Sequence, residues 1–332
     1  MFSKAVGIDL GTANILIYVK GEGVVIEEPS VVSIDAQTKK CLAVGQEAKD
    51  MLGRTPGRVL AIRPLKDGVI ADFEVTEMML QHFVRKLNLK GIFSRPTILI
   101  CCPSNITSVE RKAISDAAYR AGAKRVYIEE EPKVAAVGAN LDIAKPTGSM
   151  VLDIGGGTTD VAILSLGEIV TSTSLKVAGD KLDQDVIKFV KDKYKLLIGD
   201  RTAEEIKTHI GTAWKEDIES LEQKTIAVSG RDLVTGLPNT IQLRAEETAE
   251  AMAESLQDIV RACRTVLEQT PPELSADIVT RGIVLTGGGA LLHGLDKLIS
   301  HELNIPVYVA ENALSCVAEG TGIMLENLDL VG

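Results

Sequence analysis

Apolar and polar positions alternate in the same way at two places in the chain. Short runs rich in β-branched residues at 6–10, 15–19 and 23–27 are separated by the turns "GTAN" and "KGE", a pattern that predicts an antiparallel meander of three strands. The runs at 151–154, 161–166 and 169–174 repeat the scheme. Asp153 follows Asp9, and Gly155 follows Gly11, at the same interval of 144 residues. The two meanders therefore match position by position.

Such a long interval indicates a duplicated domain rather than a solenoid, so we expect two α/β lobes. Strands are also predicted in "TILICCP" and "GIVLTGGG". Apolar residues at helical spacing predict helices over 74–87, 108–121, 182–194, 203–210, 247–267 and 290–301. The charge-rich segment 203–244 reads as a small subdomain inserted in the second copy, and 32–64 as its counterpart in the first.

Length and composition agree with two soluble lobes. The chain has 332 residues, of which 45% are hydrophobic, enough for two cores. A formal net charge of −10 disfavours nucleic acid as a partner. The five cysteines form no C-x-x-C pair, which favours a reducing, cytoplasmic compartment. Because no apolar run reaches about 18 residues, a spanning helix is not expected.

The turns after the first strand of each meander offer small residues whose backbone N–H groups can approach an anion. These turns are "GTAN" at 11–14 and "GGGTT" at 155–159. Each alone could be a simple hairpin turn, but as a matched pair they favour phosphate binding. Asp9 and Asp153 would repel each other across a cleft, which suggests Mg²⁺ between them, held through water. No Walker-type G-x-x-x-x-G-K-[ST] motif occurs.

Two further motifs have equally ordinary interpretations. The glycine cluster in "VLTGGGALLHGLDKLI" could place backbone against an adenine or ribose, or could be a tight strand-to-helix turn. In "AEEIK", Glu204 and Lys207 lie one helical turn apart, a spacing that usually marks a surface ion pair.

Taken together, these motifs resemble the superfamily of actin, sugar kinases and heat-shock chaperone ATPases. Within it, "GIDLGTAN", "RPLKDGVIADF", "EEEPKVAAVGANL", "DIGGGTTDVAI", "LLIGDRTAEEIK", "RDLVTGLP", "PPELSADIV" and "LTGGGALLHGLD" resemble the MreB/Mbl family of bacterial actins, which guide rod-shape wall synthesis. The resemblance covers nearly the whole chain. It implies an actin-like fold of two duplicated ribonuclease-H-like lobes around a nucleotide cleft, with a small inserted subdomain in each.

The resemblance also implies four subdomains. They are IA (1–32, 66–140 and 310–332), IB (33–65), IIA (141–178 and 243–309) and IIB (179–242). It implies ATP or ADP bound with Mg²⁺, the metal near Asp9 and Asp153. Phosphate contacts fall on Thr12, Ala13, Asn14, Gly156, Gly157 and Thr158. Adenosine contacts fall on Glu204, Glu205, Ile206, Lys207, Gly287, Gly288, Gly289 and Ala290.

For hydrolysis, the family position that orients the attacking water falls on Glu131, with Thr158 assisting. On sequence alone, the acids of "EEEP" could simply start a helix, yet a carboxylate is suited to holding a water in line with a terminal phosphate. Between Asp9 and Tyr18 there is no lysine or arginine. Charge compensation is therefore expected from metal and backbone.

The family resemblance further implies head-to-tail filaments of this chain on the inner face of the cytoplasmic membrane, in contact with the cell-wall elongation machinery. Ile92 and Phe93, in a turn flanked by glycine and proline, are the expected membrane wedge, although such a pair can also pack under its own loop. A small-molecule kinase of the same superfamily is the alternative function. A chaperone-type ATPase is disfavoured because no β-rich substrate domain follows residue 332 of this sequence.

Overall fold

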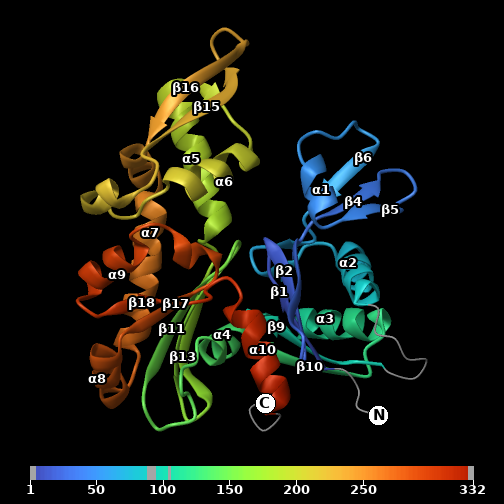
Figure 1. The fold of residues 1–332 in the computed structure, drawn as a ribbon, viewed down its shortest axis with the longest axis vertical. Coiled ribbons are helices and arrows are strands. Elements are labelled where there is room, and N and C mark those ends of the chain that lie inside the picture. The colour runs from blue at the N-terminus through green and yellow to red at the C-terminus, as the bar shows by residue number, and fades with distance from the viewer. Residues whose placement is uncertain (1–4, 88–94, 104–105, 328–332) are drawn as a thin grey trace.

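The computed structural model describes residues 5–87, 95–103 and 106–327, which form two halves lying side by side (Figure 1). The first half is built on a five-stranded sheet in the order β10-β9-β1-β2-β3. Its strands are β1 (Ala5–Leu10), β2 (Asn14–Val19), β3 (Gly23–Pro29), β9 (Thr97–Cys102) and β10 (Arg125–Glu130).

The second half repeats this topology in the order β18-β17-β11-β12-β13. Its strands are β11 (Ser149–Ile154), β12 (Thr159–Ser165), β13 (Glu168–Leu175), β17 (Ile283–Thr286) and β18 (Val307–Val309). In both sheets the first strand of the meander pairs antiparallel with the second and parallel with a later strand, β9 or β17. The predicted duplication is confirmed by this shared strand order.

Two helices of the first half begin at side-chain caps. In the first half, the Asp72 side chain accepts the Val75 N–H at the start of α2 (Phe73–Lys86), and a Thr107–Glu110 capping box starts α3 (Ser108–Ala121). Gly122, with φ of 114°, ends α3.

The second half carries α7 (Ala245–Glu268), α8 (Pro272–Arg281) and α9 (Leu295–Leu303). Their buried faces complete the second core.

The predicted helix over 290–301 was wrong as a single element. A 3₁₀ turn, η2 (Gly288–Leu291), ends before Gly294, and α9 begins only at Leu295. Gly294 adopts φ of 70°, and a Cβ built on it would lie 2.5 Å from the Trp214 Cβ. The chain therefore turns sharply where it passes close to the backbone and Cβ of Trp214, a conformation that glycine permits and a continuous helix would not.

A small sheet rises above each half (Figure 1). We call β4 (Val32–Asp35), β5 (Cys41–Val44), β6 (Val59–Ile62) and α1 (Gln46–Met51) the first small subdomain. The second small subdomain contains α5 (Gly179–Tyr194), α6 (Asp200–Ile210), η1 (Lys215–Ser220), β14 (Leu196–Leu197), β15 (Thr225–Asp232) and β16 (Pro238–Arg244). A short hairpin of β7 (Leu65–Lys66) and β8 (Val69–Ile70) leads from the first small subdomain back to its half.

Two short helices cross between the halves. They are α4 (Glu131–Gly138), which follows β10, and α10 (Cys316–Glu326), which follows β18. Val134 of α4 and Val317 of α10 share one apolar cluster with residues of both large sheets. The crossing is close: a Cβ at Gly138 would lie 1.8 Å from the Cys316 carbonyl oxygen, and one at Gly320 would lie 2.1 Å from that of Val134. The two halves are therefore joined at a tight helix pair directly below the cleft.

Gly320→Ala is expected to lower the free energy of unfolding by about 1–3 kcal/mol, because the added methyl group must push the two helices apart. Gly57→Ala is the matched control, since a Cβ there meets nothing within 4 Å. Urea denaturation followed by circular dichroism measures both. Equal stability of the two variants would show that the α4–α10 crossing is not sterically tight.

Candidate functional site

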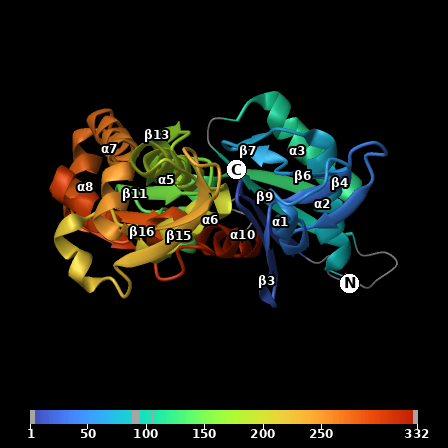
Figure 2. The same cartoon turned by 90° about the horizontal axis from the view of Figure 1, so that it is seen from above.

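A cavity of about 580 Å³ lies between the two halves, with walls from both of them and from both small subdomains. Figure 2, seen from above, shows the two halves on either side of this region. The loop after β1 and the loop after β11 face each other in it, as the matched meanders predict. The duplicated architecture thus brings the two glycine-containing turns into one site.

The two loops approach so closely that the second needs glycine. A Cβ at Gly156 would lie 2.6 Å from the Ala13 Cβ, and one at Gly157 would lie 2.7 Å from the Thr12 Oγ1. Within the second loop, the Gly155 N–H donates to the Thr158 carbonyl over 2.9 Å. A side chain at either glycine would force the halves apart, so these residues maintain the spacing of the cleft.

Ser30, at the junction of β3 and β4, fixes the first loop. Its Oγ donates to the Gly11 carbonyl over 2.7 Å, and its N–H donates to the Ala13 carbonyl over 2.9 Å. Ser30 has no exposed surface. The backbone of the first loop is therefore held in place before any ligand arrives.

The N-terminus of α5 rests on the second loop. The N–H groups of Gly179 and Asp180 donate to the carbonyls of Gly155 and Gly156 over 3.1 and 2.8 Å. Lys207 of α6 ties this end down, because its Nζ lies 2.9 Å from both the Gly179 carbonyl oxygen and the Asp183 Oδ1. The site thereby gains a fixed ammonium and the positive end of a helix, both suited to an anionic ligand.

Three carboxylates face the cavity from below the loops: Asp9, Glu131 and Asp153. Partial burial between the halves, followed by the charge of Asp153, raises the pKa of Asp9 to about 8. Burial raises the pKa of Asp153 to about 6, although a hydrogen bond from Thr286 opposes the shift. Burial, and then the charges of Asp160, Asp9 and Asp153, raise the pKa of Glu131 well above its ordinary value. The site concentrates negative charge that a cation could offset.

Asp160 and Thr286 are site residues that the sequence reasoning missed. Asp160 is buried on β12 directly opposite Asp153 in the strand register, and Thr286 lies opposite Asp153 on β17. The Thr286 Oγ1 donates to the Asp153 Oδ1 over 2.7 Å. The repeat does contain a signal for both, because the positions equivalent to them around Asp9 are Leu16 and Cys101. Asp160 and Thr286 are therefore polar at positions where the first copy of the repeat has Leu16 and Cys101, and such a difference between the copies indicates a role specific to the second.

The carboxylates fit the predicted Mg²⁺ in their chemistry. Oxygen ligands suit this hard cation, and burial, which raises the pKa of both Asp9 and Asp153, disfavours their charged forms unless a cation is bound beside them. Over residues 5–87, 95–103 and 106–327, no three histidine, cysteine or acidic side chains gather as a ready set of direct ligands.

Most residues expected at the site line the cavity, but three do not. Those that line it are Asp9, Thr12, Ala13, Asn14, Glu131, Asp153, Gly156, Gly157, Thr158, Glu204, Lys207, Gly287, Gly288 and Gly289. Ile206 and Ala290 point into the second core, and Glu205 pairs with Arg201 on the outer face of α6. The expected membrane residues, Ile92 and Phe93, lie outside the described residues.

The first small subdomain contributes two cations that the sequence did not reveal. Lys49 of α1 and Arg63, just after β6, both line the cavity. The tip of the β7–β8 hairpin also reaches the loops, since the Gly68 N–H donates to the Thr12 Oγ1 over 3.2 Å. Positive charge around the cavity therefore comes from distant segments rather than from the first loop, which carries none.

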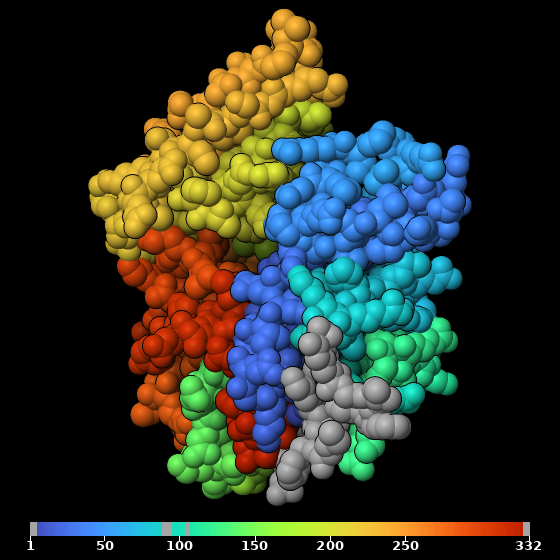
Figure 3. All heavy atoms as spheres, turned by 45° about the vertical axis from the view of Figure 1, so that its right-hand side comes forward, coloured from blue at the N-terminus to red at the C-terminus, as the bar shows by residue number. Residues whose placement is uncertain are grey.

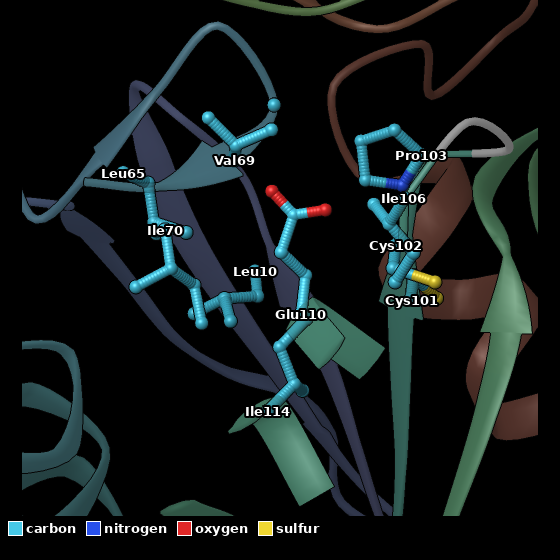
Figure 4. Close-up of a pocket in the computed structure, with 11 residues that line it drawn as sticks. Leu10, Leu65, Val69, Ile70, Cys101, Cys102, Pro103, Ile106, Glu110 and Ile114 are labelled. Carbon is cyan, nitrogen blue, oxygen red and sulfur yellow. The ribbon is translucent and has the colours of Figure 1, made fainter. Parts of the chain in front are cut away.

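A second, much smaller cavity of about 10 Å³ lies behind the β7–β8 hairpin. Figure 4 shows Leu10, Leu65 and Ile70 on one side of it and Cys101, Cys102 and Pro103 on the other. Its volume corresponds to about one water molecule. It is too small to compete with the large cavity as a ligand site.

Comparison with known proteins decides the family. Residues 3–332 match the family model described as MreB/Mbl protein. The chain belongs to the MreB/Mbl family. The cell shape-determining protein Mbl of Bacillus subtilis (strain 168) is 60% identical to this MreB/Mbl-family chain, over 99% of this chain and 98% of that protein. The cell shape-determining protein MreB of Escherichia coli (strain K12) is 52% identical, over 100% and 96%.

Solved structures confirm the actin-like fold of this family member. MreB5 of Spiroplasma citri bound to ADP superposes with a TM-score of 0.93 at 40% identity, covering 98% of this chain and 97% of that one. The same protein bound to AMPPNP gives a TM-score of 0.94, covering 99% and 98%. A MamK double helical filament, 21% identical, gives 0.82, covering 97% and 98%, and shows the shared fold.

No helix within the described ranges is long and apolar enough to cross a membrane.

Proposed function

We propose that this chain is a bacterial actin that binds and hydrolyses ATP between its two halves. It polymerises into membrane-associated filaments that organise cell-wall synthesis and maintain rod shape. One observation carries the proposal: two register-matched loops face each other across a 580 Å³ cavity, with buried carboxylates beneath them. The names of its relatives, cell shape-determining proteins, support the same function.

The loops supply the phosphate site. Backbone N–H groups at Thr12, Ala13 and Asn14 on one side, and at Gly156, Gly157 and Thr158 on the other, surround the triphosphate. The N-terminus of α5 and the Lys207 ammonium add positive potential. Glu204 and the 287–289 backbone face the part of the cavity left for adenosine. Nucleotide in this position contacts both halves and favours their closed arrangement.

Glu131 provides the hydrolytic function. It begins α4, the helix that joins the halves, and its carboxyl group faces the same cavity as Thr158. A buried carboxyl at this point orients the attacking water toward the terminal phosphate, and the Thr158 hydroxyl assists. Asp9 and Asp153 would hold Mg²⁺, which would offset the negative charge of the phosphates. Hydrolysis is slow and serves filament turnover.

Negative-stain electron microscopy with ATP and liposomes tests the proposed assembly. Wild-type protein is expected to form filaments on the lipid surface with ATP. Glu131→Ala is expected to form filaments that persist, because bound ATP is not consumed. Monodisperse monomers under all conditions, together with transfer of phosphate to a sugar, would instead support the small-molecule kinase.

The proposed membrane contact has a separate test. Ile92→Ser combined with Phe93→Ser is expected to abolish co-sedimentation with liposomes, because two large apolar side chains that could enter the bilayer are lost. Filaments in solution are expected to remain. Unchanged co-sedimentation of the double variant would exclude Ile92 and Phe93 as the membrane anchor.

A further inference from the structure

Two ion pairs cross the cavity from the first small subdomain to the second. The Lys49 Nζ of α1 lies 3.1 Å from the Glu204 Oε1 of α6, and the Arg63 Nη1 lies 3.1 Å from the Asp180 Oδ1 of α5. All four residues line the cavity. In Figure 3 the blue spheres of the first small subdomain meet the yellow and yellow-green spheres of the second. The pairs therefore lie where the cavity is covered.

Both acidic partners belong to the structure that holds the second phosphate loop. The Asp180 N–H donates to the Gly156 carbonyl, so Arg63 pairs with a residue that directly supports the loop. Glu204 lies one helical turn before Lys207, which binds the Gly179 carbonyl at the same end of α5. Each ion pair thus connects the first small subdomain to a helix that supports the phosphate site.

The two ion pairs are weak enough to break and re-form as the small subdomains separate and close. Their side chains are between 29% and 38% exposed, so water and salt weaken the attraction. Neither pair is buried deeply enough to make separation prohibitive. Two such contacts acting together would slow the opening of the subdomains without preventing it.

We propose that Lys49 and Arg63 form a two-point latch that holds the small subdomains together over bound nucleotide and sets the rate at which nucleotide leaves. This inference rests on the proposed nucleotide site and adds to it the residues that control release. Closing brings Lys49 to Glu204 and Arg63 to Asp180, and opening breaks both ion pairs. The latch acts on the dissociation rate, because both ion pairs must break before the small subdomains separate.

The dissociation rate of 1,N⁶-etheno-ATP, whose ribose is unmodified, tests the latch. Wild-type protein loaded with the fluorescent analogue and Mg²⁺ is mixed with excess ATP in a stopped-flow instrument. Lys49→Gln and Arg63→Gln are each expected to raise the dissociation rate by about two- to fivefold, the range for partly exposed ion pairs. The double variant is expected to show at least the larger of these effects. High salt is expected to speed release from wild type but not from the double variant.

Arg58→Gln is the matched control. Arg58 pairs with Asp35 over 2.9 Å, but both residues belong to the first small subdomain. Its loss removes an ion pair of the same subdomain without touching the cavity, so the dissociation rate is expected to stay at the wild-type value. Far-ultraviolet circular dichroism checks that each variant is folded.

A charge exchange distinguishes the latch from a general loss of positive charge near the phosphates. Arg63→Asp is expected to accelerate release more than Arg63→Gln, and adding Asp180→Arg is expected to return the rate to within about twofold of wild type. Release from the Lys49 and Arg63 variants at the rate of Arg58→Gln would overturn the latch while leaving the nucleotide site intact. Failure of wild-type protein to bind the analogue would overturn the site and the latch together.

Discussion

Glu131→Gln is expected to reduce the rate of ATP hydrolysis by roughly 100-fold while leaving nucleotide binding nearly unchanged. Glutamine keeps the size of this residue, which is only 7% exposed, but an NH₂ group replaces one of the two carboxyl oxygens, so the side chain orients the attacking water less well. Substitution also removes a charge that burial and three neighbouring acids oppose, so the nucleotide-free protein is expected to become more stable. Phosphate release in a single turnover measures the catalytic effect.

Glu130→Gln is the matched control, because Glu130 is the adjacent acid and makes no side-chain capping bond at the start of α4. It is expected to hydrolyse ATP at a rate within about twofold of wild type. If both variants lost activity equally, the effect would come from disturbing the start of α4. If neither lost activity, Glu131 would not orient the water.

Asp9→Asn is expected to raise the free energy of unfolding of the metal-free, nucleotide-free protein by roughly 2–5 kcal/mol at pH 8. Burial and Asp153 raise the folded-state pKa of Asp9 from 3.8 to about 8. Over that interval the folded state binds a proton that the unfolded state has lost. Wild-type stability therefore falls as pH rises from about 4 to about 8, and the penalty is complete above pH 8. The advantage of the variant is expected to grow over the same window.

The same substitution is expected to weaken nucleotide binding in the presence of Mg²⁺, because Asp9 is one of the two proposed supports of the metal. Urea denaturation in a chelator at several pH values measures the first effect, and titration with etheno-ATP measures the second. Asp192→Asn, on the exposed face of α5, is the control for both. If the Asp9→Asn protein were less stable than wild type at pH 8, the charged form of Asp9 would not destabilise the folded state.

The pattern of apolar and polar residues predicted the parts of the fold that depend on neighbouring residues in the sequence. The strand runs and the matched interval between Asp9 and Asp153 identified both sheets, and the shared strand order confirmed the duplication. Where a prediction was wrong, a tertiary contact decided the outcome. The chain turns at Gly294 because its backbone lies close to Trp214. The sequence around residue 294 does not indicate this contact, so a continuous helix was predicted there.

The loops of the candidate site could be predicted because each is continuous in the sequence. Its remaining walls could not, since they come from separate segments. Lys49 and Arg63 line the cavity only because the first small subdomain packs against the second across it, and no sequence motif around these residues indicates a ligand. In "AEEIK", helical geometry directs Glu204 and Lys207 toward the cavity and leaves Ile206 in the core. A contiguous motif identifies the helix but not which of its residues face the ligand.

A crystal structure with Mg²⁺ and a non-hydrolysable ATP analogue tests the central claim most directly. The account predicts the triphosphate between the 12–14 and 156–158 backbones, the metal near Asp9 and Asp153, and Glu131 facing the terminal phosphate. Nucleotide bound elsewhere, or phosphates that contact only one of the two loops, would contradict it.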